Sequence, residues 1–147
     1  MTAASHTVTN QAPPLVGYDV FTSDRALAEA VSRHLPAELL DEALGELRAL
    51  GRATGSEQVR EWGELANAFP PRLRTHDRYG HRIDEVEFHP SWHRLLGKAV
   101  AAGLTDAWGR PGGHVRRAAG FLVATQAEAG HGCPVSMTHA AVPRLRL

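Results

Sequence analysis

In this 147-residue sequence, the feature that most resembles a metal-binding site is a pair of histidines four positions apart. His89 and His93 bracket the segment HPSWH, and on one helix they would share a face, as a pair of zinc ligands does. No glutamate lies between them as in the HExxH motif, and Pro90 favours a helix that begins after His89. Capping and packing are therefore the expected roles of these histidines, and we predict no metal site.

A single cysteine offers a second kind of chemistry. Cys133 follows His131 by two residues and precedes a predicted helix, and either neighbour could favour a reactive thiolate. The expected alternative is a small apolar residue buried beside Pro134, which is common for an isolated cysteine. One cysteine cannot form an internal disulfide, which predicts a location in the reducing cytoplasm.

Glycine-rich and arginine-rich segments could bind anions. The loop Gly109–Gly113 precedes a predicted helix, but it matches neither GxxxxGK[ST] nor GxGxxG, so a plain loop is expected. Two groups of arginines could contact phosphate, although surface ion pairs are the expected alternative. The groups are Arg110, Arg116 and Arg117, and Arg72, Arg74, Arg78 and Arg82. From its residues alone, the chain contains no self-sufficient active site.

The hydrophobic spacing predicts an all-α fold, a bundle of five or six helices with an extended arm over residues 1–22. In the arm, Pro13-Pro14 favours an extended path, and Val16, Tyr18 and Phe21 are expected to pack on an apolar surface. The predicted helices run from a cap at Ser23 or Asp24 to about His34, from Pro36 to the region Gly51–Gly55, from a cap at Ser56 to Pro70-Pro71, from Pro90 or Ser91 to about Ala102, from about His114 to Ala129, and from near Val135 to before Pro143.

The stretch near 73–88 has a different character. Asp77-Arg78-Tyr79-Gly80 is typical of a tight turn, and Gly80 could adopt the positive φ that such turns need. Alternating apolar residues on both sides favour a small hairpin, and an ordered irregular loop is the alternative.

Composition excludes several classes of protein. The chain carries 16 basic and 16 acidic side chains, and this zero net charge argues against a dedicated nucleic-acid-binding domain. Hydrophobic residues make up 43%, enough for a core, but no run approaches the ~18 apolar residues of a membrane span. Residues 1–70 contain more acidic than basic side chains, and residues 71–147 contain more basic than acidic ones. The two halves could attract each other or form two differently solvated surfaces.

Three long segments stand out as a set: HTVTNQAPPLVGYDVFTSD, GELANAFPPRLRTHDRYGHRIDEVEFHPSWHRLL and QAEAGHGCPVSMTHAAVPRLR. Together they resemble the N-terminal domain of the adaptive-response, AidB-like branch of the acyl-CoA dehydrogenases. The resemblance covers roughly residues 6–146 and assigns residues 23–147 to an N-terminal helical domain.

The resemblance implies a much longer parent protein. Members are homotetramers with an N-terminal helical domain, a central β-domain and a C-terminal helical domain, and FAD lies between the last two. A carboxylate removes the α-proton of an acyl-CoA thioester, and the flavin accepts a hydride. The branch is associated with the response to DNA alkylation, and binding of double-stranded DNA has been attributed to it.

The resemblance implies that this chain contains only part of what the family needs for its activity. The flavin-binding motif of the type GMxMTExxGGSD, the β-domain and the C-terminal helical domain are not in the sequence. We therefore expect no catalytic or cofactor-binding residue here, no FAD bound by this chain alone and no DNA binding through this segment. Met137 and Thr138 are expected to neighbour the acyl pocket, and the arm and residues 72–88 to contact other subunits. The alternative is a standalone helical module for interaction or oligomerisation.

Overall fold

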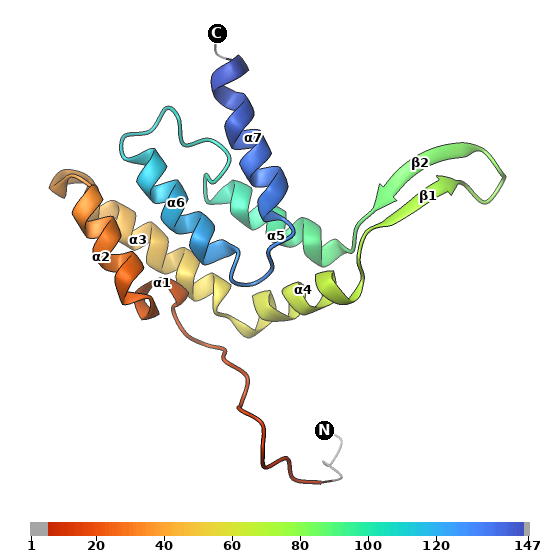
Figure 1. Ribbon diagram of the computed structural model, residues 1–147, viewed down its shortest axis with the longest axis horizontal. Coiled ribbons are helices and arrows are strands. Elements are labelled where there is room, and N and C mark those ends of the chain that lie inside the picture. The colour runs from red at the N-terminus through yellow and green to blue at the C-terminus, as the bar shows by residue number, and fades with distance from the viewer. Residues whose placement is uncertain (1–5, 146–147) are drawn as a thin grey trace.

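The computed structural model describes residues 6–145, which fold into seven helices and one two-stranded hairpin (Figure 1). The elements are α1 (Val20–Ser23), α2 (Arg25–His34), α3 (Ala37–Thr54), α4 (Glu57–Ala68), β1 (Arg72–His76), β2 (Arg82–Glu87), α5 (Pro90–Ala101), α6 (Gly113–Ala124) and α7 (Gly132–Leu145). The predicted helical fold with a small hairpin is confirmed. Residues 1–5 of the expected arm and the last two residues of the expected domain lie outside the described part.

Short polar side chains begin the helices at the predicted positions. The Asp24 carboxylate accepts a hydrogen bond from the Leu27 N–H at 2.9 Å, and the Ser56 hydroxyl accepts one from the Val59 N–H at 3.3 Å. These bonds satisfy N–H groups that have no partner inside the first helical turn. Pro36 occupies the N-cap of α3, where its missing N–H costs nothing.

The segment before α2 is not wholly extended, which corrects the prediction of an arm as far as residue 22. The Asp19 carboxylate accepts hydrogen bonds from the N–H groups of Phe21 and Thr22 at 3.0 and 3.3 Å, and so begins α1. Val20 and Phe21 are then buried in the main core, with Phe21 only 1% exposed. Burial of these side chains offsets the poor intrinsic stability of so short a helix.

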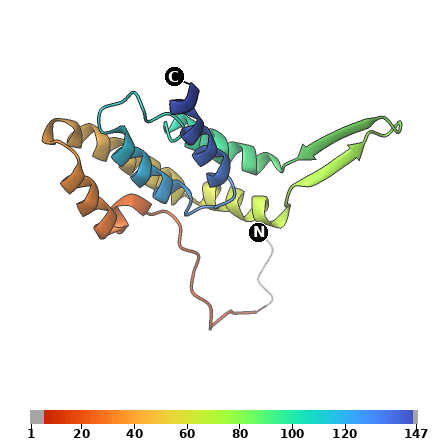
Figure 2. The ribbon, with the colours of Figure 1, turned by 45° about the horizontal axis from the view of Figure 1, so that its top comes forward.

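The hairpin is confirmed and projects from the body. β1 and β2 are antiparallel, with Leu73 opposite Val86, and Gly80 adopts a φ of 87° in the turn between them. The two views show the hairpin extending past the ends of α4 and α5, away from the other helices (Figures 1 and 2).

The last two helices differ in length from the prediction. α6 ends at Ala124 rather than Ala129, because the chain after it turns back and the Glu128 side chain bonds the backbone at the start of α7. α7 begins at Gly132 and continues through Pro143 rather than ending before it.

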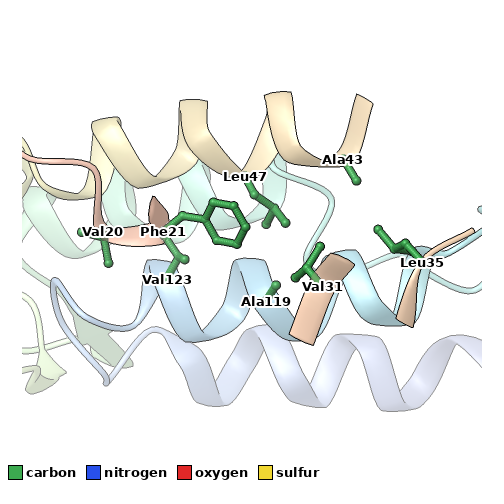
Figure 3. Close-up of a cluster of buried hydrophobic side chains, with 8 residues drawn as sticks. All are labelled: Val20, Phe21, Val31, Leu35, Ala43, Leu47, Ala119 and Val123. Atoms are coloured by element: carbon green, nitrogen blue, oxygen red, sulfur yellow. The ribbon is translucent and has the colours of Figure 1, made fainter. Parts of the chain in front are cut away.

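The main hydrophobic core lies between α1, α2, α3 and α6 (Figure 3). Its buried members are Val20, Phe21, Val31, Leu35, Ala43, Leu47, Ala119 and Val123. A smaller cluster of Ala99, Leu104, Ala124 and Val135 joins α5, α6 and α7. Among residues 6–145, no helix combines the length and the apolar character that crossing a bilayer requires.

Candidate functional site

One face of α7 presents a mainly uncharged surface to solvent, with the exposed Arg144 in its last turn. We call this surface the outer face of α7; it consists of Cys133, Met137, Ala140 and Ala141, with Thr138 at its edge. All five residues are exposed, and Met137 is 67% exposed. The predicted pocket neighbours Met137 and Thr138 thus lie together on this face. An exposed helix face that is mainly uncharged is typical of a surface that another element covers.

The opposite face of α7 holds the helix on the body. Val135, 1% exposed, packs in the small cluster with Ala99, Leu104 and Ala124. Because Val135 faces inward, residues two positions before and after it face outward on the helix. The docking of α7 therefore decides which residues form its outer face.

The indole of Trp108 compensates for the proline inside α7. In an α-helix the carbonyl of His139 would accept the N–H of residue 143, but Pro143 has none. The Trp108 Nε1–H donates to that carbonyl instead, at 2.7 Å, and the indole stacks on the His139 ring with 4.9 Å between centroids. Burial, followed by the charges of Arg117 and His114, lowers the pKa of His139, so this ring is neutral near pH 7.

A buried carboxylate organises the turn before α7. Glu128 accepts hydrogen bonds from the backbone N–H of Gly130, from the backbone N–H of His131 at 3.0 Å and from the His131 ring at 3.0 Å. Burial would raise the pKa of Glu128, but these hydrogen bonds outweigh it and hold the pKa below its ordinary value. The sequence analysis missed this pair, whose available signal was an acidic residue three positions before a histidine flanked by glycines.

The environment of Cys133 differs from the prediction. The cysteine is exposed rather than buried, and its Sγ lies 3.9 Å from the Sδ of Met137. The ring of His131 binds Glu128 and is 2% exposed. Its geometry therefore makes it a partner of Glu128, which leaves the activation of Cys133 by His131 without support.

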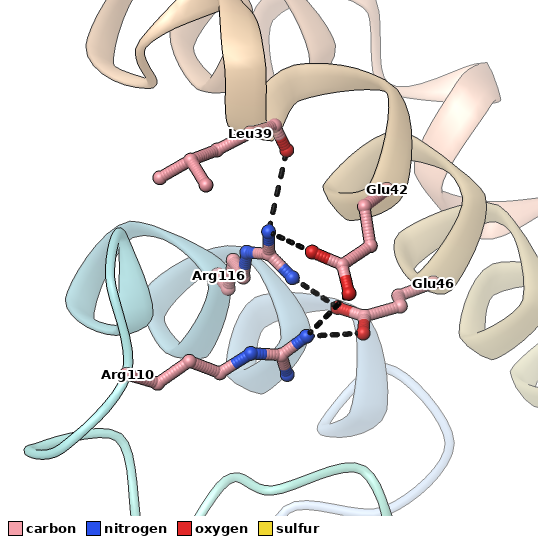
Figure 4. A network of polar contacts seen from close by, with 5 residues as sticks. All are labelled: Leu39, Glu42, Glu46, Arg110 and Arg116. Atoms are coloured by element: carbon pink, nitrogen blue, oxygen red, sulfur yellow. Dashed lines mark hydrogen bonds and ion pairs between the residues drawn. The ribbon is translucent and has the colours of Figure 1, made fainter.

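Arg116 is a buried cation at the contact of α3 and α6 (Figure 4). Its side chain is 6% exposed and donates to Glu42 at 2.7 Å, Glu46 at 3.0 Å and the Leu39 carbonyl at 3.3 Å. Arg110 also pairs with Glu46 and, at 3.5 Å, with Glu42. The hydrogen bond from Arg116 lowers the pKa of Glu42. These pairs join the acidic and the basic half of the chain, which was one of the two alternatives, and Arg116 is buried rather than on the surface.

The two histidines of HPSWH serve the structure. His89 caps α5 by accepting a hydrogen bond from the Ser91 N–H at 3.2 Å, and its ring stacks on Phe69. His93 is exposed and contacts the ring of Trp92 edge-on. Within residues 6–145, no group of three or more potential His, Cys, Asp or Glu ligands lies close enough to hold a metal ion.

The loop Gly109–Gly113 does not fit the phosphates of a flavin. A Cβ at Gly113 would collide with the carbonyl of Ala107, and one at Gly112 would meet the Leu35 side chain at 2.6 Å. The Gly113 N–H is also occupied by the Arg110 carbonyl at 2.9 Å. These two glycines allow close packing against Ala107 and Leu35, which is in line with the interpretation as a plain loop.

The arginines of the hairpin lie among acidic residues. Arg82 pairs with Asp84 at 2.6 Å, and Arg72 and Arg74 stand opposite Glu87 and Glu85 in the strand register. Exposed pairs of this kind contribute little to stability, typically about 0–1 kcal/mol. They support the expected ion pairs rather than a phosphate site.

Comparison with known proteins identifies relatives over nearly the whole chain. The family model described as "Adaptive response protein AidB N-terminal domain" matches residues 10–147. A protein of Escherichia coli (strain K12) named as an acyl-CoA dehydrogenase, AidB, is 41% identical over 145 residues, which are 96% of this chain and 26% of that protein. This chain therefore spans about a quarter of the length of that relative.

Two solved structures share the fold. The apo-form of Bd2924 matches with a TM-score of 0.85 and 27% identity, over 95% of this chain and 28% of that one. Caenorhabditis elegans ACDH-11 in complex with C11-CoA matches with a TM-score of 0.81 and 23% identity, over 97% of this chain and 25% of that one.

Replacement of Trp108 by Phe should destabilise α7 only while Pro143 is present. The substitution keeps the ring but removes the donor to the His139 carbonyl, and we expect a loss of about 1 kcal/mol in the free energy of unfolding. In the Pro143→Ala background the new N–H can bond the same carbonyl, so the loss should shrink. A double-mutant cycle by urea unfolding measures the difference, and equal losses in both backgrounds would contradict the assignment.

Acidification should remove a contribution that depends on Glu128. Because its folded-state pKa is lowered, this carboxylate stabilises the fold above the ordinary glutamate pKa, and the contribution is lost as pH falls through the folded pKa. Glu128→Gln should cost about 1–3 kcal/mol at pH 7 and should flatten the decline of stability below pH ~5. Urea unfolding at a series of pH values tests this, with exposed Glu61→Gln as the matched control. An unchanged slope in Glu128→Gln would refute it.

Proposed function

Because this chain belongs to the family of AidB N-terminal domains, we propose that it serves as the N-terminal helical domain of an FAD-dependent acyl-CoA dehydrogenase of the AidB-like branch. The 41% identity to the E. coli relative over nearly all of this chain supports the choice of branch. The proposal places the protein in the cytoplasm and in the response to DNA alkylation.

The outer face of α7 is the observation that carries the proposal. Along Cys133, Met137, Ala140 and Ala141 this face is exposed and uncharged, with Arg144 following in the last turn, so it is suited to contact with another domain. We infer that the central β-domain covers this face and that Met137 and Thr138 then border the acyl pocket. The ACDH-11 structure is a complex with C11-CoA, which supports an acyl-CoA as the ligand class.

In this proposal the chain forms one side of the acyl pocket, and it does not supply the reacting groups. FAD would supply hydride acceptance when bound, and we propose that the other domains hold it. The close packing of Gly112 and Gly113 in the loop Gly109–Gly113 supports this, because that loop is the glycine-rich segment before α6. The described residues instead fix α7 through Trp108 and Glu128, which determines where Met137 and Thr138 lie. We propose that the chain by itself does not oxidise acyl-CoA.

DNA contact through this segment is not part of the proposal. Its net charge is zero, and its most buried arginine, Arg116, is already paired with Glu42 and Glu46. Affinity for DNA depends on cations that can neutralise phosphates. DNA binding by a longer protein would then lie in its other domains.

Co-expression tests whether the outer face of α7 meets the remaining domains. We expect this chain to form a yellow, flavin-containing complex with the part of the E. coli relative outside the matched region. Ala141→Glu should abolish that complex by placing a charge in the interface. Ala30→Glu, on an exposed face of α2, should leave it intact. Flavin absorbance after affinity purification is the measurement, and tight FAD binding by this chain alone would contradict the proposal.

A standalone oligomerisation module is the second candidate, and the hairpin favours it. A two-stranded hairpin is only marginally stable alone, yet Leu73 and Val86 are 63% and 55% exposed on facing positions. We propose that this face contacts another subunit, in line with the homotetramers of the family.

Light scattering after size exclusion tests the role of the hairpin. Wild type should form an oligomer that Leu73→Ser combined with Val86→Ser dissociates, because the two exposed apolar side chains are lost. Leu122→Ser, at a 53% exposed position of α6, is the control for loss of an apolar residue elsewhere. A monomeric wild type at high concentration would exclude self-association through this face.

A further inference from the structure

A cavity of about 490 Å³ lies between α3, the end of α5, the loop that follows it and α6. Leu47, Leu50 and Leu104 form its apolar wall. Cavities of a few hundred cubic ångströms with mainly apolar walls and a few polar groups are typical of small-molecule sites. None of the lining residues belongs to α7, so the cavity is separate from the outer face described above.

The charged part of the lining has more cations than carboxylates. Its members are Lys98, Arg110, Arg116 and Arg117 against Glu46 and Asp106. Arg110 and Arg116 are engaged with carboxylates of α3, and their role in joining the helices is sufficient to explain them. Even so, the Arg116 Nε is buried and without a hydrogen-bond partner in the described part of the chain.

Arg117 also contacts its neighbours, but none of the partners found among the described residues is a carboxylate. Its guanidinium lies over the Phe121 ring, with the central carbon 5.1 Å from the ring centroid. Its Nε donates to the Leu104 carbonyl at 3.0 Å and one terminal nitrogen donates to the Ser136 hydroxyl at 3.2 Å. Both acceptors are neutral, so neither balances the charge of the half-buried guanidinium, and burial lowers the pKa of Arg117. A guanidinium has five N–H donors, so this side chain can still bind an anion while it keeps both contacts.

We propose that the cavity binds a small organic anion, whose oxyanion head group pairs with Arg117 and whose aliphatic body lies along Leu47, Leu50 and Leu104. A guanidinium forms bidentate hydrogen bonds with carboxylate and with phosphate, so either head group satisfies the chemistry. The apolar wall selects against inorganic anions, and the excess of cations selects against neutral molecules. This site does not depend on the proposed dehydrogenase role, because its walls come from this chain.

Calorimetric titration with matched probes tests the proposal and distinguishes the head groups. We expect hexanoate or hexyl phosphate to bind one-to-one with a dissociation constant of about 1 mM or tighter. Hexan-1-ol and inorganic phosphate, which lack the charge and the apolar body respectively, should bind at least about tenfold more weakly. Amide NMR shifts should map to Gly103, Leu104 and Gly120, which line the cavity or its entrance.

Two variants separate binding from folding. Arg117→Gln removes the charge and should weaken the anion about tenfold, the loss expected for a charge-assisted hydrogen bond. Ala101→Trp, at an exposed position of α5 that lines the cavity, should block binding while the buried core is unchanged. Arg33→Gln, exposed near the end of α2, makes the same charge change away from the cavity and should bind as wild type does.

The proposal would be overturned by any of three results. These are no saturable binding of either anion, equal affinity for hexan-1-ol, or unchanged affinity in a folded Arg117→Gln variant. Amide shifts confined to the outer face of α7 would also overturn it, because they would place the ligand at a different surface.

Discussion

The buried guanidinium of Arg116 is the constraint on which the arrangement of helices depends. A charge removed from water must be paired, so α6 can dock on α3 only where Arg116 meets Glu42 and Glu46. The apolar core beneath, around Leu47 and Ala119, is non-directional and would tolerate sliding of one helix along the other. The ion pairs therefore fix the position of α6 along α3 more than they add to the net stability of the fold. They join residues separated by 70 or more positions in the chain.

The register of α6 determines the position of the final helix. The loop before α6 carries Trp108, whose indole holds the carbonyl that Pro143 leaves without a partner. The turn after α6 carries Glu128, which closes on the start of α7. The two ends of α7 are thus fixed by segments that flank α6, and Arg117 adds a bond to Ser136 between them. These contacts decide which residues of α7 form its outer face.

The distribution of polar groups fits a positioning role for the domain. Its buried ionisable groups are charge-paired within the chain: Arg116 with Glu42 and Glu46, and Glu128 with His131, although the Arg116 Nε has no hydrogen-bond partner in the described residues. They hold turns and helix contacts and are not presented to a shared cleft as acid, base and nucleophile would be. Arg117 differs from these groups, because it lines a cavity and its hydrogen-bond acceptors are neutral.

The sequence by itself determined the elements whose causes are local. The caps at Asp24 and Ser56, the turn at Gly80 and the periods of the central helices each depend on residues within a few positions of one another. The resemblance carried by three segments placed the chain in its family. Only the tertiary structure decided that the turn at Val20 and Phe21 becomes helical, because the benefit comes from burial against α3.

Tertiary contacts likewise decided that α7 continues through Pro143 and that Cys133 is exposed. The donor for the freed carbonyl is Trp108, which lies 31 residues away in the sequence. The exposure of Cys133 follows from the way Val135 packs on α5. Local sequence patterns predict which backbone conformations are favourable. They do not predict which distant group will donate to a carbonyl or cover a side chain. That information exists only once α3, α6 and α7 are assembled.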